Sequence, residues 1–136
     1  MREILFKAKR IDNGEWVEGY LVKACQNTYP NGYEIIDKNG INYDELDCWQ
    51  SSFTSYEVDE KTICQYTGLV DKNGNKIWEN DIVRLDEDFY IVTWEEGDAM
   101  FVLEDVGLIE PFKNADSKWC EVVGNTIDST EFLTSK

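Results

Sequence analysis

The chain of 136 residues contains no histidine, and its four cysteines include no C-x-x-C pair. A Ser-His-Asp triad or a Cys-His pair needs histidine as its general base, so those classes of enzyme are excluded. A zinc site of the usual spacing is excluded as well. The phosphate-binding patterns G-x-x-x-x-G-K-[ST] and G-x-G-x-x-G are also missing. We therefore expect a protein without a metal or an organic cofactor.

Basic residues are scarce: 13 lysines and arginines stand against 28 acidic residues, and the net charge is -15. Binding to a phosphate backbone depends on basic side chains that displace counterions, so direct binding to nucleic acid is not expected. The simplest role of such a surface is solubility. The alternative is attraction to a basic partner, as in a DNA-mimic inhibitor of a DNA-binding protein, where carboxylates would stand in for phosphates.

The sequence has no apolar run of the length that a membrane span requires. Residues 1–7 lack an apolar signal segment followed by a cleavage site. We therefore expect a soluble protein of a reducing cytoplasm, with Cys25, Cys48, Cys64 and Cys120 as free thiols.

Turn signals divide the chain into short segments typical of β-strands. Hydrophobic residues make up 42% and aromatic residues 13%, which is enough for a globular core. Four Asn-Gly pairs, at residues 13–14, 31–32, 39–40 and 73–74, indicate hairpin turns. The first predicted hairpin joins residues 4–11 with 15–23, and the second joins residues 33–36 with 41–43.

The second half shows the strand pattern most clearly. Segments rich in β-branched and aromatic residues occur at 82–85, 90–94, 100–103 and 121–124. Residues 44–61 and 108–118 have no clean period and are interpreted as connectors, and residues 129–133 as a terminal helical turn. The predicted fold is mainly β with little helix: an N-terminal β-hairpin lobe (residues 1–62) followed by a small SH3-like barrel (residues 63–136), joined as one compact unit.

Two kinds of polar cluster suggest a calcium site or a catalytic site, but neither kind matches the motif that such a site requires. Residues 71–75 resemble the start of a calcium loop, but Lys76 stands where glycine is required and Ile82 where a glutamate is required. Carboxylates also cluster at residues 44–47, 86–88, 95–98 and 104–105. All four clusters fall in predicted turns or strand ends, where acidic residues are common because they are exposed to solvent. No motif supports catalysis there.

Three blocks of the sequence together resemble the YopX family of phage and prophage proteins. They are residues 2–8, residues 62–83 with the run Gln-Tyr-Thr-Gly-Leu, and residues 121–125. Asn80 departs from the family, which commonly has glycine there, and Cys64 stands where a small residue is usual. Asn80 still tolerates the turn conformations that glycine would adopt.

The resemblance implies a mostly β protein of a bacteriophage or prophage, from a family whose biochemical role is undefined, and it supplies no catalytic residues. Self-association is a further expectation from the resemblance. We predict a non-catalytic accessory factor that contacts a host or phage protein in the cytoplasm of the bacterial host, where the alternative DNA mimic would inhibit a host DNA-binding protein. Its candidate interaction surface is formed by Gln65, Tyr66, Thr67, Gly68, Leu69, Trp78 and Asp81. The alternatives are the DNA mimic and an enzyme of unfamiliar type.

Overall fold

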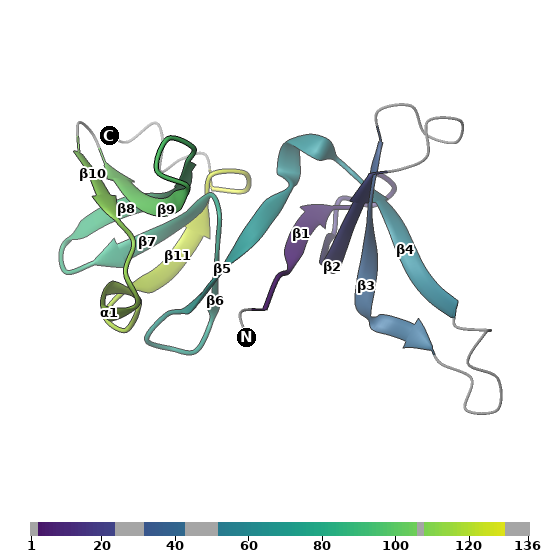
Figure 1. Cartoon of the computed structure of the whole chain (residues 1–136), viewed down its shortest axis with the longest axis horizontal. Helices are drawn as coiled ribbons and strands as arrows, with labels where there is room; N and C mark the ends of the chain where they lie inside the picture. The colour runs from purple at the N-terminus through teal and green to yellow at the C-terminus, as the bar shows by residue number, and fades with distance from the viewer. Residues whose placement is uncertain (1–2, 24–31, 43–51, 106–107, 130–136) are drawn as a thin grey trace. The chain divides into compact units, whose positions relative to one another are not determined.

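A computed structural model describes residues 3–23, 32–42, 52–105 and 108–129 (Figure 1). The described residues are mainly β, as predicted, and their only helical elements are a 3₁₀ turn and one short α-helix. The chain divides into two compact units, Glu3–Gln65 and Tyr66–Lys136. The predicted domain boundary after residue 62 stays a prediction.

The first unit is built on four antiparallel strands, in the order β4-β3-β2-β1. They are β1 (Phe6–Lys9), β2 (Trp16–Lys23), β3 (Tyr33–Asn42) and β4 (Ser52–Val58), and the 3₁₀ turn Glu60–Thr62 follows β4. The first predicted hairpin is confirmed as β1 and β2, with Gly14 in its turn at a φ of 72°. A bridge between Arg10 and Val58 joins the end of β1 to the end of β4, so the sheet curls.

One face of this sheet carries the core of the first unit. Ala8, Val17, Ile35 and Val58 form its buried cluster. Gly19 also lies on this face, and a Cβ at Gly19 would stand 1.9 Å from the carbonyl oxygen of Ile36. Only glycine therefore lets the backbone of β3 approach β2 so closely.

The second predicted hairpin, around residues 37–40, is wrong. β3 continues through Asn39 and Gly40 as one strand. Its pairing with β4 shifts register between Ile36 and Ile41, so the extra residues are absorbed as an irregularity rather than as a turn. β3 pairs with β2 up to Asp37 and with β4 again from Ile41, so the segment between them stays extended although its residue types favour a turn.

β5 (Cys64–Val70) begins in the first unit and continues into the second. Its first two residues pair with β1, and its later residues pair with β6 (Lys76–Trp78). The same tetrapeptide that fails to turn in β3 makes the predicted turn here, with Gly74 at a φ of 82°.

The second unit contains an open antiparallel sheet in the order β10-β9-β8-β7-β11 (Figure 1). Its strands are β7 (Asp81–Leu85), β8 (Asp88–Glu95), β9 (Met100–Asp105), β10 (Leu108–Pro111) and β11 (Glu121–Asn125), and the helix α1 (Asn114–Ser117) precedes β11. Its core cluster is Ile77, Val83, Val92, Leu103 and Cys120.

The four strands predicted in the second half are confirmed as β7, β8, β9 and β11. In the described residues this sheet is open, with β10 and β11 as its two edges. The closed SH3-like barrel therefore stays a prediction. Both predicted connectors also contain strands, β4 in the first and β10 in the second. Most of the predicted terminal helical turn lies outside the described residues, as does the Asn-Gly pair at 31–32 except for its glycine.

Candidate functional site

The predicted interaction surface lies in the segment from β5 to β7, and most of it is buried. Tyr66, Thr67, Trp78 and Asp81 are between 2% and 8% exposed. Gln65 and Leu69 are partly buried, and Gly68 is exposed with a φ of 87°. The four buried side chains therefore form part of the protein interior and cannot serve as a surface.

Each buried polar group of this segment has a hydrogen-bonding role within it. The Thr67 hydroxyl donates to the carbonyl oxygen of Ile77 at 2.8 Å and accepts the N–H of Leu69 at 3.1 Å. The Asp81 carboxylate accepts the N–H of Trp78 at 2.8 Å. The rings of Trp78 and Tyr66 pack against each other with centroids 5.4 Å apart. The segment is a hydrogen-bonded clasp between β5, β6 and β7.

Asn80 occupies the position where glycine is usual in the family that the sequence resembles. Its φ is 72°, in the left-handed region that glycine enters most easily and asparagine tolerates. Its N–H donates to the carbonyl oxygen of Val92 at 2.7 Å, and its own carbonyl oxygen accepts the N–H of Thr126 at 2.9 Å. The turn that Asn80 makes connects three separate parts of the second unit.

Asp71 is an extensively hydrogen-bonded carboxylate, and it is 4% exposed. One oxygen accepts the N–H groups of Asn73 and Asn75, each at 2.9 Å, and the other accepts the N–H of Val122 at 3.0 Å. Burial alone raises the pKa of Asp71, but these N–H donors outweigh burial and lower it below its ordinary value. Asp71 therefore ties the β5–β6 turn to β11 rather than binding a cation.

Cys64 and Cys120 are buried free thiols. The Cys120 thiol donates to the carbonyl oxygen of Ser117 at 3.4 Å. Burial, followed by the nearby charge of Asp71, raises the pKa of Cys120 to about 11. A thiol with so high a pKa is a poor nucleophile at neutral pH, so Cys120 is a core residue.

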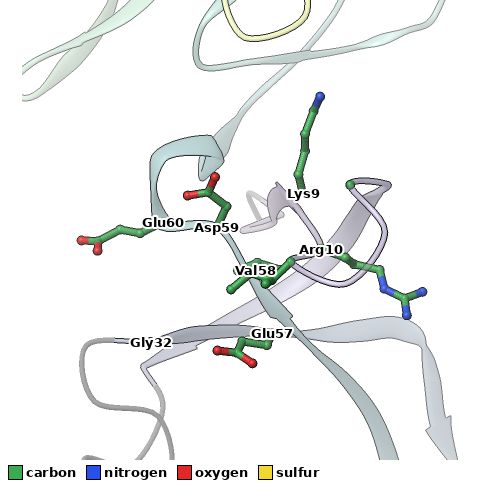
Figure 2. Close-up of a pocket in the computed structure, with 9 residues that line it drawn as sticks. Lys9, Arg10, Gly32, Glu57, Val58, Asp59 and Glu60 are labelled. Atoms are coloured by element: carbon green, nitrogen blue, oxygen red, sulfur yellow. The ribbon is translucent and has the colours of Figure 1, made fainter.

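The first unit has a cavity of about 620 Å³ where the ends of β1 and β4 meet. Its lining includes Lys9, Arg10, Glu57, Asp59 and Glu60. Figure 2 shows that the charged ends of Lys9, Arg10 and Glu60 point away from one another. The Arg10 guanidinium instead binds both oxygens of Asp12, at 2.9 and 2.6 Å. The cavity thus lacks the convergent polar groups that a catalytic or small-ligand site requires.

The carboxylate clusters that the structure describes lie at turns and strand ends, as expected. Residues 86–87 and 96–99 are turns, and residues 104–105 end β9; the cluster at 44–47 is outside the described residues. Burial raises the pKa of Tyr90, and the negative charges of Asp88, Glu110 and Asp105 raise it further. No group of three or more potential ligands within the described ranges could hold a metal ion.

The sheet β1–β4 has a second face, opposite its core cluster, which we call the outer face. Because side chains alternate along a strand, it carries Lys7, Lys9, Trp16, Glu18, Tyr20, Val22, Glu34, Ile36, Lys38, Phe53, Ser55 and Glu57. Tyr20 is 46% exposed, Val22 38% and Phe53 60%. Large apolar side chains are therefore gathered on one solvent-facing side of a sheet.

The strand alternation in the sequence indicates that both sides of residues 16–23 carry apolar residues. It does not show which side is covered, and it does not single out Tyr20, Val22 or Phe53. The outer face is the functional candidate that sequence reasoning missed. Its aromatic content is visible in the sequence, but its exposure depends on the pairing of four strands.

Comparison with protein families gives a match to the model described as "YopX protein", over residues 6–134. The match covers nearly the whole chain. The chain belongs to the YopX family. The resemblance carried by the segment from β5 to β7 is thereby confirmed, and this segment of the YopX chain is the hydrogen-bonded clasp described above.

A solved structure supports the fold over its full length. The crystal structure of protein EF1440 from Enterococcus faecalis matches with a TM-score of 0.67 at 23% sequence identity, covering 98% of this chain and 99% of that chain. Comparison with curated proteins gives no match. Among the helices of the described residues, none is long and apolar enough to cross a membrane.

Proposed function

We propose that this YopX-family chain is a non-catalytic accessory factor of a phage or prophage that binds another protein in the host cytoplasm. The observation that carries the proposal is the outer face, where Tyr20, Val22 and Phe53 are exposed together on one sheet. Exposed apolar groups gathered on one face of a domain are typical of a protein-binding surface. The outer face therefore replaces the buried part of the predicted surface.

A non-catalytic role is supported by the state of the reactive groups. Asp71 and Asp81 are buried acceptors of backbone hydrogen bonds, and Cys120 has a raised pKa. The charged groups around the cavity of the first unit diverge. An enzyme of unfamiliar type would instead need acids or thiols that converge on a pocket.

The test is affinity capture from host cells in which the phage or prophage is active. The baits are the wild-type chain and a double variant that combines Tyr20→Ala with Phe53→Ala. The matched control is Ile109→Ala, which removes a side chain 58% exposed on β10 of the second unit. We expect a specific protein to be captured by wild type and control and lost with the double variant. Equal capture by all three baits would refute the outer face as the binding surface.

The DNA mimic is the second candidate, and the net charge of -15 is the observation that motivates it. The position of the described carboxylate clusters at turns and strand ends counts against it. A mimic would compete with duplex DNA for a basic groove, and this competition would weaken steeply as salt increases. Competition assays between the chain and labelled duplex for the captured partner decide this: an unchanged affinity of the partner for DNA rules out mimicry.

A further inference from the structure

Trp94 and Phe101 form an aromatic corner at the end of the β8–β9 hairpin. They are register partners on the two strands, their ring centroids are 5.0 Å apart, and their planes meet at 71°. Because side chains alternate along a strand, Trp94 lies on the same side of β8 as the buried Val92. Trp94 itself is 42% exposed, so it lies where the core of the second unit ends and solvent begins.

The fold holds this aromatic corner in place. Phe101 is partly buried and packs against the core cluster of the second unit. Its carbonyl oxygen accepts the N–H of Phe112 at 3.1 Å, which ties β9 to the segment after β10. Phe112 packs against the same core cluster. A group that binds beside Trp94 therefore meets a ring pair that is already ordered, and binding to a preformed site costs less entropy.

The surroundings of the aromatic corner are negative. Residues 86–112, which include β8, β9 and β10, contain nine acidic residues and no lysine or arginine. Glu95 is the last residue of β8, and Glu96 and Asp98 lie in the turn that leads from β8 to β9. The aromatic corner is thus next to three carboxylates on the same hairpin.

An exposed aromatic ring among carboxylates favours a cation as its ligand. The face of an aromatic ring carries partial negative charge and attracts a cation placed over it. The guanidinium of arginine is planar and weakly hydrated, so it stacks on a ring more readily than a strongly hydrated ammonium does. Its N–H groups can at the same time donate to a carboxylate.

We propose that the aromatic corner binds an arginine side chain in a basic segment of a partner protein. The guanidinium stacks on the ring of Trp94 and donates to the carboxylate of Glu96 or Asp98. The inference goes beyond the proposed function, because the aromatic corner belongs to the second unit and includes no residue of the outer face. One contact of this kind is weak and is screened by salt, so it is measured at low ionic strength.

NMR titration tests the contact directly. The probe is the acetylated and amidated peptide Gly-Arg-Gly-Arg-Gly, compared with the same peptide carrying lysine or glutamate in place of arginine. The five tryptophans give five indole N–H signals, and Trp94→Phe identifies the signal of Trp94. We expect the arginine peptide to shift that signal in a saturable way, the lysine peptide to bind more weakly and the glutamate peptide not to bind. Equal binding of the arginine and lysine peptides, or shifts that spread over all acidic residues without saturation, overturns the proposal.

Substitutions of Trp94 separate stacking of the cation from apolar packing. Trp94→Leu keeps an apolar side chain and removes the aromatic ring, whereas Trp94→Ala removes both. We expect each to weaken binding of the arginine peptide about tenfold, as read from the backbone signals of the turn at 96–99. The matched control is Trp119→Ala, which removes a tryptophan 76% exposed in the same unit and should bind like the wild type. Unchanged binding by a folded Trp94→Leu chain refutes the stacked guanidinium.

A second pair of variants tests the carboxylates and keeps the Trp94 signal as the reporter. Glu96→Gln combined with Asp98→Asn should weaken binding of the arginine peptide. Glu87→Gln combined with Asp88→Asn is the control, because it removes the same charge from exposed side chains at the other end of β8. If both pairs of substitutions weaken binding equally, the attraction comes from the net charge of the chain and the proposed contact is refuted.

The outcomes separate this inference from the proposed function. The double variant of Tyr20→Ala with Phe53→Ala should bind the arginine peptide as tightly as the wild type. If the arginine peptide does not bind but the outer face still captures a protein, the aromatic corner is refuted and the proposed function stands. If the peptide binds at Trp94 but the double variant captures as much protein as the wild type, the aromatic corner stands and the outer face is refuted.

Discussion

Replacing Asp71 by asparagine tests whether the family-defining segment is held by a buried carboxylate. Asparagine keeps one oxygen, which can still accept the N–H groups of Asn73 and Asn75. Its amide nitrogen then faces the N–H of Val122, which the Asp71 carboxylate accepts at 3.0 Å, so a donor is set against a donor. Hydrogen bonds to charged groups contribute about 1.5–3 kcal/mol, and we expect Asp71→Asn to lower the free energy of unfolding by about 2 kcal/mol.

The measurement is urea unfolding followed by tryptophan fluorescence, combined with a thermal melt. A loss of about 2 kcal/mol corresponds to a midpoint lower by roughly 6–10 °C for a domain of this size. Asp98→Asn is the matched control, because Asp98 is an exposed aspartate in the turn after β8 and the same charge is removed. If Asp71→Asn is no more destabilising than Asp98→Asn, the hydrogen bonds of Asp71 do not stabilise the fold as argued.

The lowered pKa of Asp71 determines how its contribution to the free energy of unfolding changes with pH. The pKa of Asp71 is lower in the folded chain than its ordinary value of 3.8, so its contribution is fully present above that value. This stability is lost as pH falls below about 4 and through the folded pKa. We expect the difference in stability between the wild type and Asp71→Asn to be constant near neutral pH and to shrink in acid. A difference that grows on acidification would contradict the direction of the shift.

Three further predictions concern other features. Asn80→Ala should be about 1 kcal/mol less stable than Asn80→Gly in urea unfolding, because the φ of 72° strains any residue with a Cβ other than asparagine or aspartate; equal stabilities would refute this. Gly19→Ala should destabilise the first unit by more than about 2 kcal/mol, because its Cβ would stand 1.9 Å from the Ile36 oxygen and a backbone cannot yield cheaply; a wild-type melt would disprove the close approach. Cys120, with its pKa raised to about 11, should resist alkylation by iodoacetamide at pH 8 until urea unfolds the chain, as peptide mass mapping would show; labelling of the native chain would contradict its burial.

The strands that can be predicted are those with a buried face. β2 alternates in residue type, and β8 carries β-branched and aromatic residues in a short run bounded by turn residues. Both patterns arise because one side of the strand packs on a core. β10 could not be predicted, since all four of its residues are exposed and its support is pairing with β9. An edge strand without a buried face leaves no periodic trace in the sequence.

The local turn signals are reliable only where the neighbouring strands allow a turn. Asp-Lys-Asn-Gly forms a turn at residues 71–74 and part of a continuous strand at residues 37–40. In the first case Asp71 finds a partner in Val122, 51 residues further along the chain. This hydrogen bond exists only in the folded sheet. Residue types alone could therefore identify both tetrapeptides as candidate turns, but not which of them forms a turn.

The same reasoning explains why the segment that identifies the family does not reveal an activity. The polar groups of Thr67, Asp71 and Asp81 are engaged in hydrogen bonds that hold β5, β6 and β7 together and tie them to β11. Replacing a residue held in this way costs stability, because its hydrogen-bond partner is left unsatisfied in the interior. On the outer face, Tyr20 and Phe53 are instead exposed, at 46% and 60%. Their exposure is the observation on which we base the proposed protein-binding role, because exposed apolar groups gathered on one face are typical of a binding surface.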